Sequence, residues 1–129
     1  MSQRLILTVL IILLGLFNLY LAASFLLHPL DMGQNFGMAS IAPMGESTLR
    51  ADFTSFFGVA GLAMAWGAWR RNADLMLVPA LMFAVSCIGR GINVLVVGPY
   101  PGWQTPMIAE ALHVVLLLAG WRLLAHKRN

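Results

Sequence analysis

Charged side chains are scarce in this chain. Only 10% of its 129 residues are Asp, Glu, Lys or Arg, whereas a soluble domain carries about a quarter. Hydrophobic residues make up 60% of the sequence. This balance excludes an ordinary soluble domain. It indicates a membrane protein whose main partner is the lipid bilayer.

Cysteine is almost absent as well. The single cysteine, Cys87, lies inside an apolar run, so no internal disulfide can form and the redox compartment is left open. The formal net charge of +3 would suggest nucleic acid in a soluble protein. Here the basic residues stand at the ends of apolar runs, where the positive-inside rule explains them. We therefore expect no nucleic-acid partner.

Four apolar runs are long enough to cross a bilayer, which takes about 20 residues. They cover residues 5–27, 49–69, 75–97 and 106–124. We predict one domain, residues 1–129, that folds as an all-α integral membrane four-helix bundle. A cleaved signal peptide is the competing interpretation of the first run, but the apolar region of a signal peptide spans only about 7 to 15 residues.

The connector at residues 28–46 contains two prolines and three glycines, which argues against one long helix. Its methionines and other apolar residues predict a loop on the bilayer surface or over the mouth of the bundle. Its methionine spacing near His28 would also suit copper(I), although apolar lid residues are the favoured explanation. We expect Ser47 or Thr48 to cap the second helix. We expect Thr105 to cap the fourth, with Pro106 in its first turn.

The distribution of cations predicts the orientation. The cations that flank the runs are Arg4, Arg70, Arg71, Arg122, Lys127 and Arg128. Four spans place all six on one side, which the positive-inside rule assigns to the cytoplasm. Both termini are therefore expected in the cytoplasm.

Four charged residues lie inside the predicted spans. Arg50 and Asp52 stand in the first turn of the second span, Arg90 near the outer end of the third, and Glu110 near the outer end of the fourth. At about 1.5 Å of rise per residue, all four fall in the outer third of the membrane. Since buried charges need partners, we predict that they meet in one cluster and form the candidate catalytic set.

Other side chains complete the predicted site. The candidate ligand-binding residues are His113, Asn93, Cys87, Asn18 and Phe56. Cys87, Arg90 and Asn93 share a helix face with Ser86 that should point into the bundle. Packing roles are the favoured alternative for His113 and Cys87. Glu110 and His113 have the spacing of di-iron bundles, but those need a second such pair and further Glu. We predict no metal and no cofactor.

Three short motifs carry a resemblance. With Arg50-Ala-Asp-Phe, Gly89-Arg90 and Glu110, the chain resembles a family of small four-span bacterial membrane proteins known as a domain of unknown function. Glycines often follow the Asp-Phe in that family, whereas Thr54 and Ser55 stand here. The resemblance implies a four-span fold and the bacterial inner membrane. It implies no reaction.

Three functions remain open. Two carboxylates beside a guanidinium suit acid–base chemistry on a small lipophilic ligand, such as epoxide opening, isomerisation or cyclisation. Arg50-x-Asp52 is similar in spacing to the carboxylate–arginine sets of limonene-type epoxide hydrolases, and the layout loosely resembles small fungal epoxide hydrolases. Alternatively, the ion network only fixes helix packing. A small transporter is the third alternative, although the arginines argue against a lone proton-carrying carboxylate. The substrate and the oligomeric state are left open.

Overall fold

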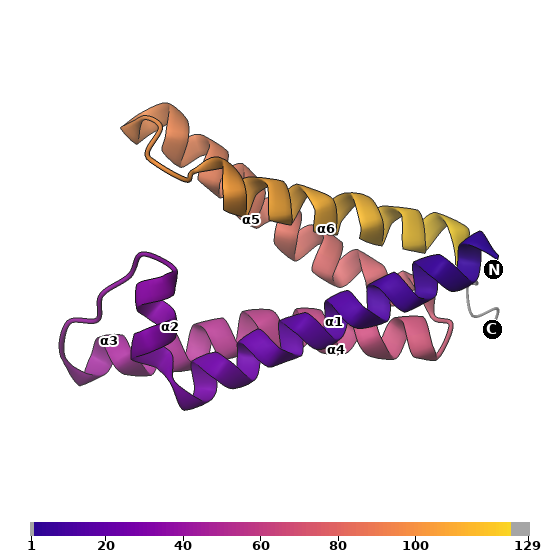
Figure 1. Cartoon of the computed structure of the whole chain (residues 1–129), viewed down its shortest axis with the longest axis horizontal. Helices are drawn as coiled ribbons and strands as arrows, with labels where there is room; N and C mark the ends of the chain where they lie inside the picture. The colour runs from indigo at the N-terminus through magenta and orange to yellow at the C-terminus, as the bar shows by residue number, and fades with distance from the viewer. Residues whose placement is uncertain (1, 125–129) are drawn as a thin grey trace.

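The computed structural model describes residues 2–124, and this part of the chain is all-α, with no strand (Figure 1). The long helices are α1 (Gln3–Leu27), α4 (Thr54–Trp69), α5 (Leu77–Val97) and α6 (Gln104–Leu123). The short elements are α2 (Pro29–Asn35), α3 (Ala42–Thr48), the π-helical turn η1 (Leu49–Phe53) and the 3₁₀ turn η2 (Ala73–Met76). The predicted fold class is therefore confirmed as all-α.

Three helical stretches are long and apolar enough to cross a membrane: Gln3–Leu27, Ala73–Val97 and Gln104–Leu123. Large apolar side chains on their outer faces, such as Leu13, Leu81 and Val115, are more than half exposed, as is expected where helices meet lipid tails. By these properties the chain is a membrane protein. α4, which falls in the predicted second span, has only 16 residues and is not one of these three stretches.

The helices form two arms that diverge from a joined end (Figure 1). α1 packs on α4 in one arm, and α5 packs on α6 in the other. Gly15 and Gly61 allow α1 and α4 to approach closely, because a Cβ on Gly61 would lie 2.7 Å from the carbonyl oxygen of Gly15. Small residues at helix contacts are the usual means of close packing within lipid.

A buried core joins the two arms at one end. It contains Leu7, Ile11, Ala60, Met64, Ala68, Ala73, Met76, Ala80, Phe83, Leu117 and Leu124. The start of α1, the turn after α4 and the end of α6 all lie at this joined end (Figure 1). Arg4, Arg70, Arg71 and Arg122 therefore lie there too, while Lys127 and Arg128 fall outside the described residues.

Two predicted helix caps are wrong. The second long helix begins well before Leu49, because helical backbone runs unbroken through α3, η1 and α4. The Thr48 hydroxyl accordingly donates to the carbonyl of Met44 at 3.0 Å and caps nothing, and Ser47 lies inside α3. α6 begins at Gln104, with Trp103 rather than Thr105 in the cap position.

The connector at residues 28–46 folds as α2 and α3 with a loop between them, and not as one long helix. α2 stands across the open end of the first arm (Figure 1). Phe36, just after α2, contacts the ring of Phe25 at a centroid distance of 5.3 Å and that of Phe57 at 6.0 Å. The apolar residues of this segment thus fold back onto the helices.

Candidate functional site

A cavity of about 1180 Å³ lies between the two arms. Its walls come from α1, the end of α2, η1, α4, α5, the loop after α5, and α6. A volume of this size is enough for a drug-sized ligand, since ligand pockets usually measure about 300–1,000 Å³. The cavity is therefore the candidate functional site.

One wall of the cavity is aromatic. Six of the seven phenylalanines in the chain line it: Phe17, Phe36, Phe53, Phe56, Phe57 and Phe83. The seventh, Phe25, is fully buried behind them and stacks on Phe53 at 4.7 Å and on Phe57 at 5.9 Å between ring centroids. Phe53, Phe56 and Phe57 share one helix face. The lining can therefore surround a lipophilic molecule.

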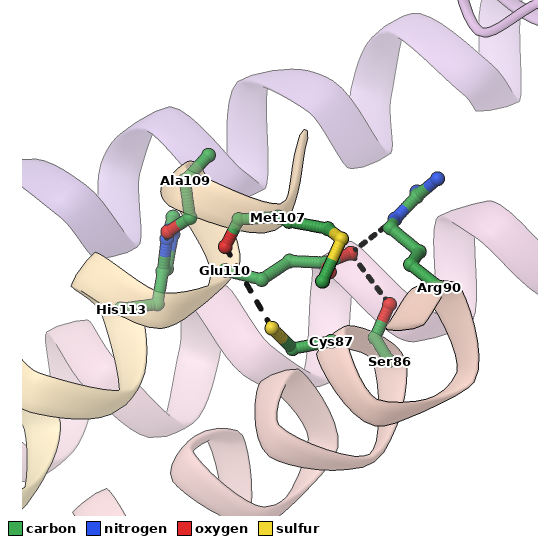
Figure 2. A network of polar contacts seen from close by, with 7 residues as sticks. All are labelled: Ser86, Cys87, Arg90, Met107, Ala109, Glu110 and His113. Atoms are coloured by element: carbon green, nitrogen blue, oxygen red, sulfur yellow. Dashed lines mark hydrogen bonds and ion pairs between the residues drawn. The ribbon is translucent and has the colours of Figure 1, made fainter. Parts of the chain in front are cut away.

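Glu110 supplies the opposite, polar wall. Its side chain is only 9% exposed, and its Oε1 accepts a hydrogen bond from Arg90 Nε at 2.8 Å and another from Ser86 Oγ at 2.6 Å (Figure 2). Ser86 and Arg90 lie four residues apart on α5, so one helix face presents both donors. The other oxygen, Oε2, is buried and has no partner among the described residues. The pair predicted between Arg90 and Glu110 is thus present.

Asn18 and His113 connect the two arms beside this wall. His113 Nδ1 donates to the Ala109 carbonyl at 2.7 Å, and Nε2 accepts from Asn18 Nδ2 at 3.0 Å. Asn18 Nδ2 also donates to the Leu14 carbonyl at 2.9 Å, which sets the orientation of the amide. One ring nitrogen donates and the other accepts, so this geometry requires a neutral imidazole. Asn18 Oδ1, like Glu110 Oε2, is buried and has no partner within residues 2–124.

The predicted four-charge cluster is wrong for two members, because only Arg90 and Glu110 are in contact. The first of these two members is Arg50. Its Nη2 pairs with Glu46 Oε1 at 2.9 Å, and its Nε donates to the Leu26 carbonyl at 3.0 Å. Arg50 does not line the cavity. The physical reason is the early start of the helix, which places Glu46 one turn before Arg50 and gives it a closer partner.

Asp52 does line the cavity, from η1. It is exposed and has no hydrogen-bond or ion-pair partner among residues 2–124. The sequence predicted Asp52 near a helix N-terminus, and this is wrong, because Asp52 lies within a continuous helix. Asp52, Arg90 and Glu110 therefore share one cavity, although they do not form one bonded network.

The predicted ligand-binding residues divide into two groups. Asn18, Phe56 and His113 line the cavity. Cys87 and Asn93 do not: the Cys87 thiol lies 3.7 Å from the Met107 carbonyl between α5 and α6, and Asn93 is exposed. The prediction that this face of α5 points into the bundle is thus only half correct. Side chains on one helix face spread over an arc, so some contact the neighbouring helix and others lie at the protein surface.

Sequence reasoning missed several lining residues. Asn35, Phe36, Gly37, Tyr100, Gly102 and Thr105 come from the two segments at the open ends of the arms. Their aromatic and polar composition was visible, but no periodic pattern assigns loop residues to a cavity. No cluster of three or more metal-binding side chains occurs among residues 2–124.

Comparison of the chain with protein-family models, with curated proteins and with solved structures found no match. The fold and the site by themselves define the class: a helical protein with three helices apolar and long enough to span a membrane, and with a cavity between two helix pairs.

Proposed function

We propose that this protein is a four-helix integral membrane protein that takes a small lipophilic molecule into the cavity between its arms and carries out acid–base chemistry on it. The observation that carries the proposal is Glu110 Oε2, a buried acceptor without a partner among the described residues, on a residue that lines a large cavity with an aromatic wall. A buried polar atom without a hydrogen bond is costly. A ligand that donates a hydrogen bond there removes this cost.

Each polar residue has a proposed role. Arg90 and Ser86 occupy Oε1 of Glu110 and fix the orientation of the carboxyl group, which leaves Oε2 as the oxygen that would accept a proton from the ligand. Asp52 faces the same cavity from the other arm, so it can exchange a proton on the opposite side of the ligand. The reaction classes that this arrangement suits are epoxide opening, isomerisation and cyclisation.

The proposed orientation places both termini in the cytoplasm and the open end of the cavity toward the outer side. It is supported by the four described arginines at the joined end, because the positive-inside rule assigns such clusters to the cytoplasm. The helical stretch through η1 and α4 then forms the one remaining span, which is the second in chain order. The family resemblance supports a bacterial inner membrane.

A structural role is the second candidate. Both donors to Glu110 lie on α5, which already packs on α6, so the ion pair is also suited to hold one arm together. Buried ion pairs often fix packing only.

The test compares bound molecules. We would purify the wild type, Asp52→Asn and Glu110→Gln, and identify co-purified lipophilic molecules by mass spectrometry. Asp31→Asn is a matched control, because Asp31 is exposed and does not line the cavity. Amides keep the shape but cannot transfer the proton, so we expect them to trap a substrate that the wild type and the control do not retain. Identical profiles, together with no turnover of isoprenoid or fatty-acid epoxides, would leave the structural role.

A further inference from the structure

The cavity carries information on the polar group of its ligand. Among the described residues, two buried side-chain polar atoms have no hydrogen-bond partner, Asn18 Oδ1 and Glu110 Oε2. Both are acceptors, and both residues line the same cavity, one from each arm. Asn18 and Glu110 are each held by their other polar atom, so both free oxygens have a fixed position. A ligand with at least two hydrogen-bond donors would satisfy both oxygens.

The net charge of the cavity lining further restricts the polar group of the ligand. Its lining contains the two carboxylates Asp52 and Glu110 against the single guanidinium of Arg90, and His113 is neutral in its observed hydrogen bonds, which leaves a net charge of −1. The sequence alone predicted a balanced cluster, but Arg50 is paired with Glu46 outside the cavity. One positive charge on the ligand would restore neutrality and would give Asp52, which has no partner among the described residues, an opposite charge.

The aromatic wall agrees with a cation. Phenylalanine faces attract a positive charge within about 6 Å of the ring centre. Phe53, Phe56 and Phe83 line the cavity together with Asp52 and Glu110. A lipophilic body and a cationic head would both find suitable surroundings there.

We infer that the ligand of this cavity is a lipophilic primary amine, bound as the ammonium between Glu110 and Asn18 with Asp52 as the counter-charge. An ammonium group has three donors and no acceptor, so one group satisfies both buried oxygens and the charge. The competing feature is Arg90, whose terminal nitrogens point away from Glu110 (Figure 2) and would attract an anion. The two carboxylates outweigh it. This inference rests on the proposed ligand-binding function of the cavity.

The experiment uses four probes with one common body. Phenylbutylamine, its N-trimethylammonium analogue, phenylbutanol and phenylbutanoate would be dialysed at neutral pH against the protein in nanodiscs, with empty discs as the background. We expect the amine to bind at least about tenfold more tightly than each of the others, which is the size of one charge-assisted hydrogen bond. Asp52→Asn should lower amine binding about tenfold and leave phenylbutanol binding unchanged, whereas Asp31→Asn should change neither.

The outcomes separate the two proposals. Equal binding of the trimethylammonium analogue, which has no N–H donor, would overturn the amine assignment, as would tighter binding of the alcohol or the carboxylate. In those cases the cavity still binds lipophilic molecules and the proposed function stands. If none of the four probes binds above the empty discs, the ligand-binding function itself fails.

Discussion

The side-chain amide of Asn18 donates a hydrogen bond to Nε2 of His113 at 3.0 Å, and this bond connects α1 to α6 across the space between the arms. The Phe83 ring lies against the imidazole, with 4.0 Å between ring centroids. The bond therefore marks the boundary between the buried core of the joined end and the cavity. Both partners line the cavity, so it holds the polar wall in position as well.

This relationship predicts a non-additive effect on stability. Asn18→Leu leaves His113 Nε2 unpaired, and we expect a loss of about 1–3 kcal/mol in the free energy of unfolding. His113→Phe should show a similar loss. The double variant replaces both partners by apolar groups, so it should lose clearly less than the sum. Unfolding in detergent measures all three, and strictly additive losses would show that the bond does not couple the arms.

The ion pair between Arg90 and Glu110 predicts a second coupling. Arg90→Ala leaves a buried carboxylate without its main donor, and we expect a loss of about 1.5–3 kcal/mol. Adding Glu110→Gln to this variant should recover part of the loss, with a coupling of about 0.5–3 kcal/mol. Arg50→Ala is the matched control, because its exposed pair with Glu46 should contribute at most about 1 kcal/mol. A larger loss for Arg50→Ala than for Arg90→Ala would contradict the assignment of the buried pair.

Alanine substitutions at two glycines should have opposite effects on stability, because only one of the two lies in the close contact between α1 and α4. In Gly61→Ala the new Cβ would lie 2.7 Å from Gly15 O and 2.9 Å from Leu19 N, which are backbone atoms that cannot move aside. We expect a loss of about 1–3 kcal/mol from overpacking. At Gly89 nothing lies within 4 Å of the added Cβ, so Gly89→Ala should stabilise the helix by about 0.5–1 kcal/mol. Thermal unfolding compares them, and equal effects would show that the two helices do not meet at Gly61.

The proposed orientation predicts the positions of two segments. A reporter fused after Arg71 should be cytoplasmic, because four arginines cluster at that end, and one fused after Gly45 should lie on the outer side. Paired activity reporters that function on only one side of the membrane measure this. If both fusions report the same side, the four-span arrangement is wrong.

Much of the helical framework follows from the sequence. The ends of the long helices at Leu27, Trp69 and Val97 coincide with the predicted ends of the apolar runs. Long apolar runs interrupted by glycine, proline and charge can only be satisfied as helices in lipid, because every backbone group must find a partner within its own segment. The pairing of Arg90 with Glu110 was also predictable, because two buried opposite charges at similar depth stabilise each other.

Which side chains share the cavity was decided only by the tertiary structure. Helical backbone begins at Ala42 and passes through a π-helical turn. Arg50 therefore pairs with Glu46, while Asp52 lines the cavity without Arg50. Sequence spacing places residues on a helix face, but it does not determine how each helix is rotated against its neighbours. The sequence by itself therefore determined the long helices and the pairing of Arg90 with Glu110. Only the packing of the arms decided that two carboxylates and one arginine face a common space.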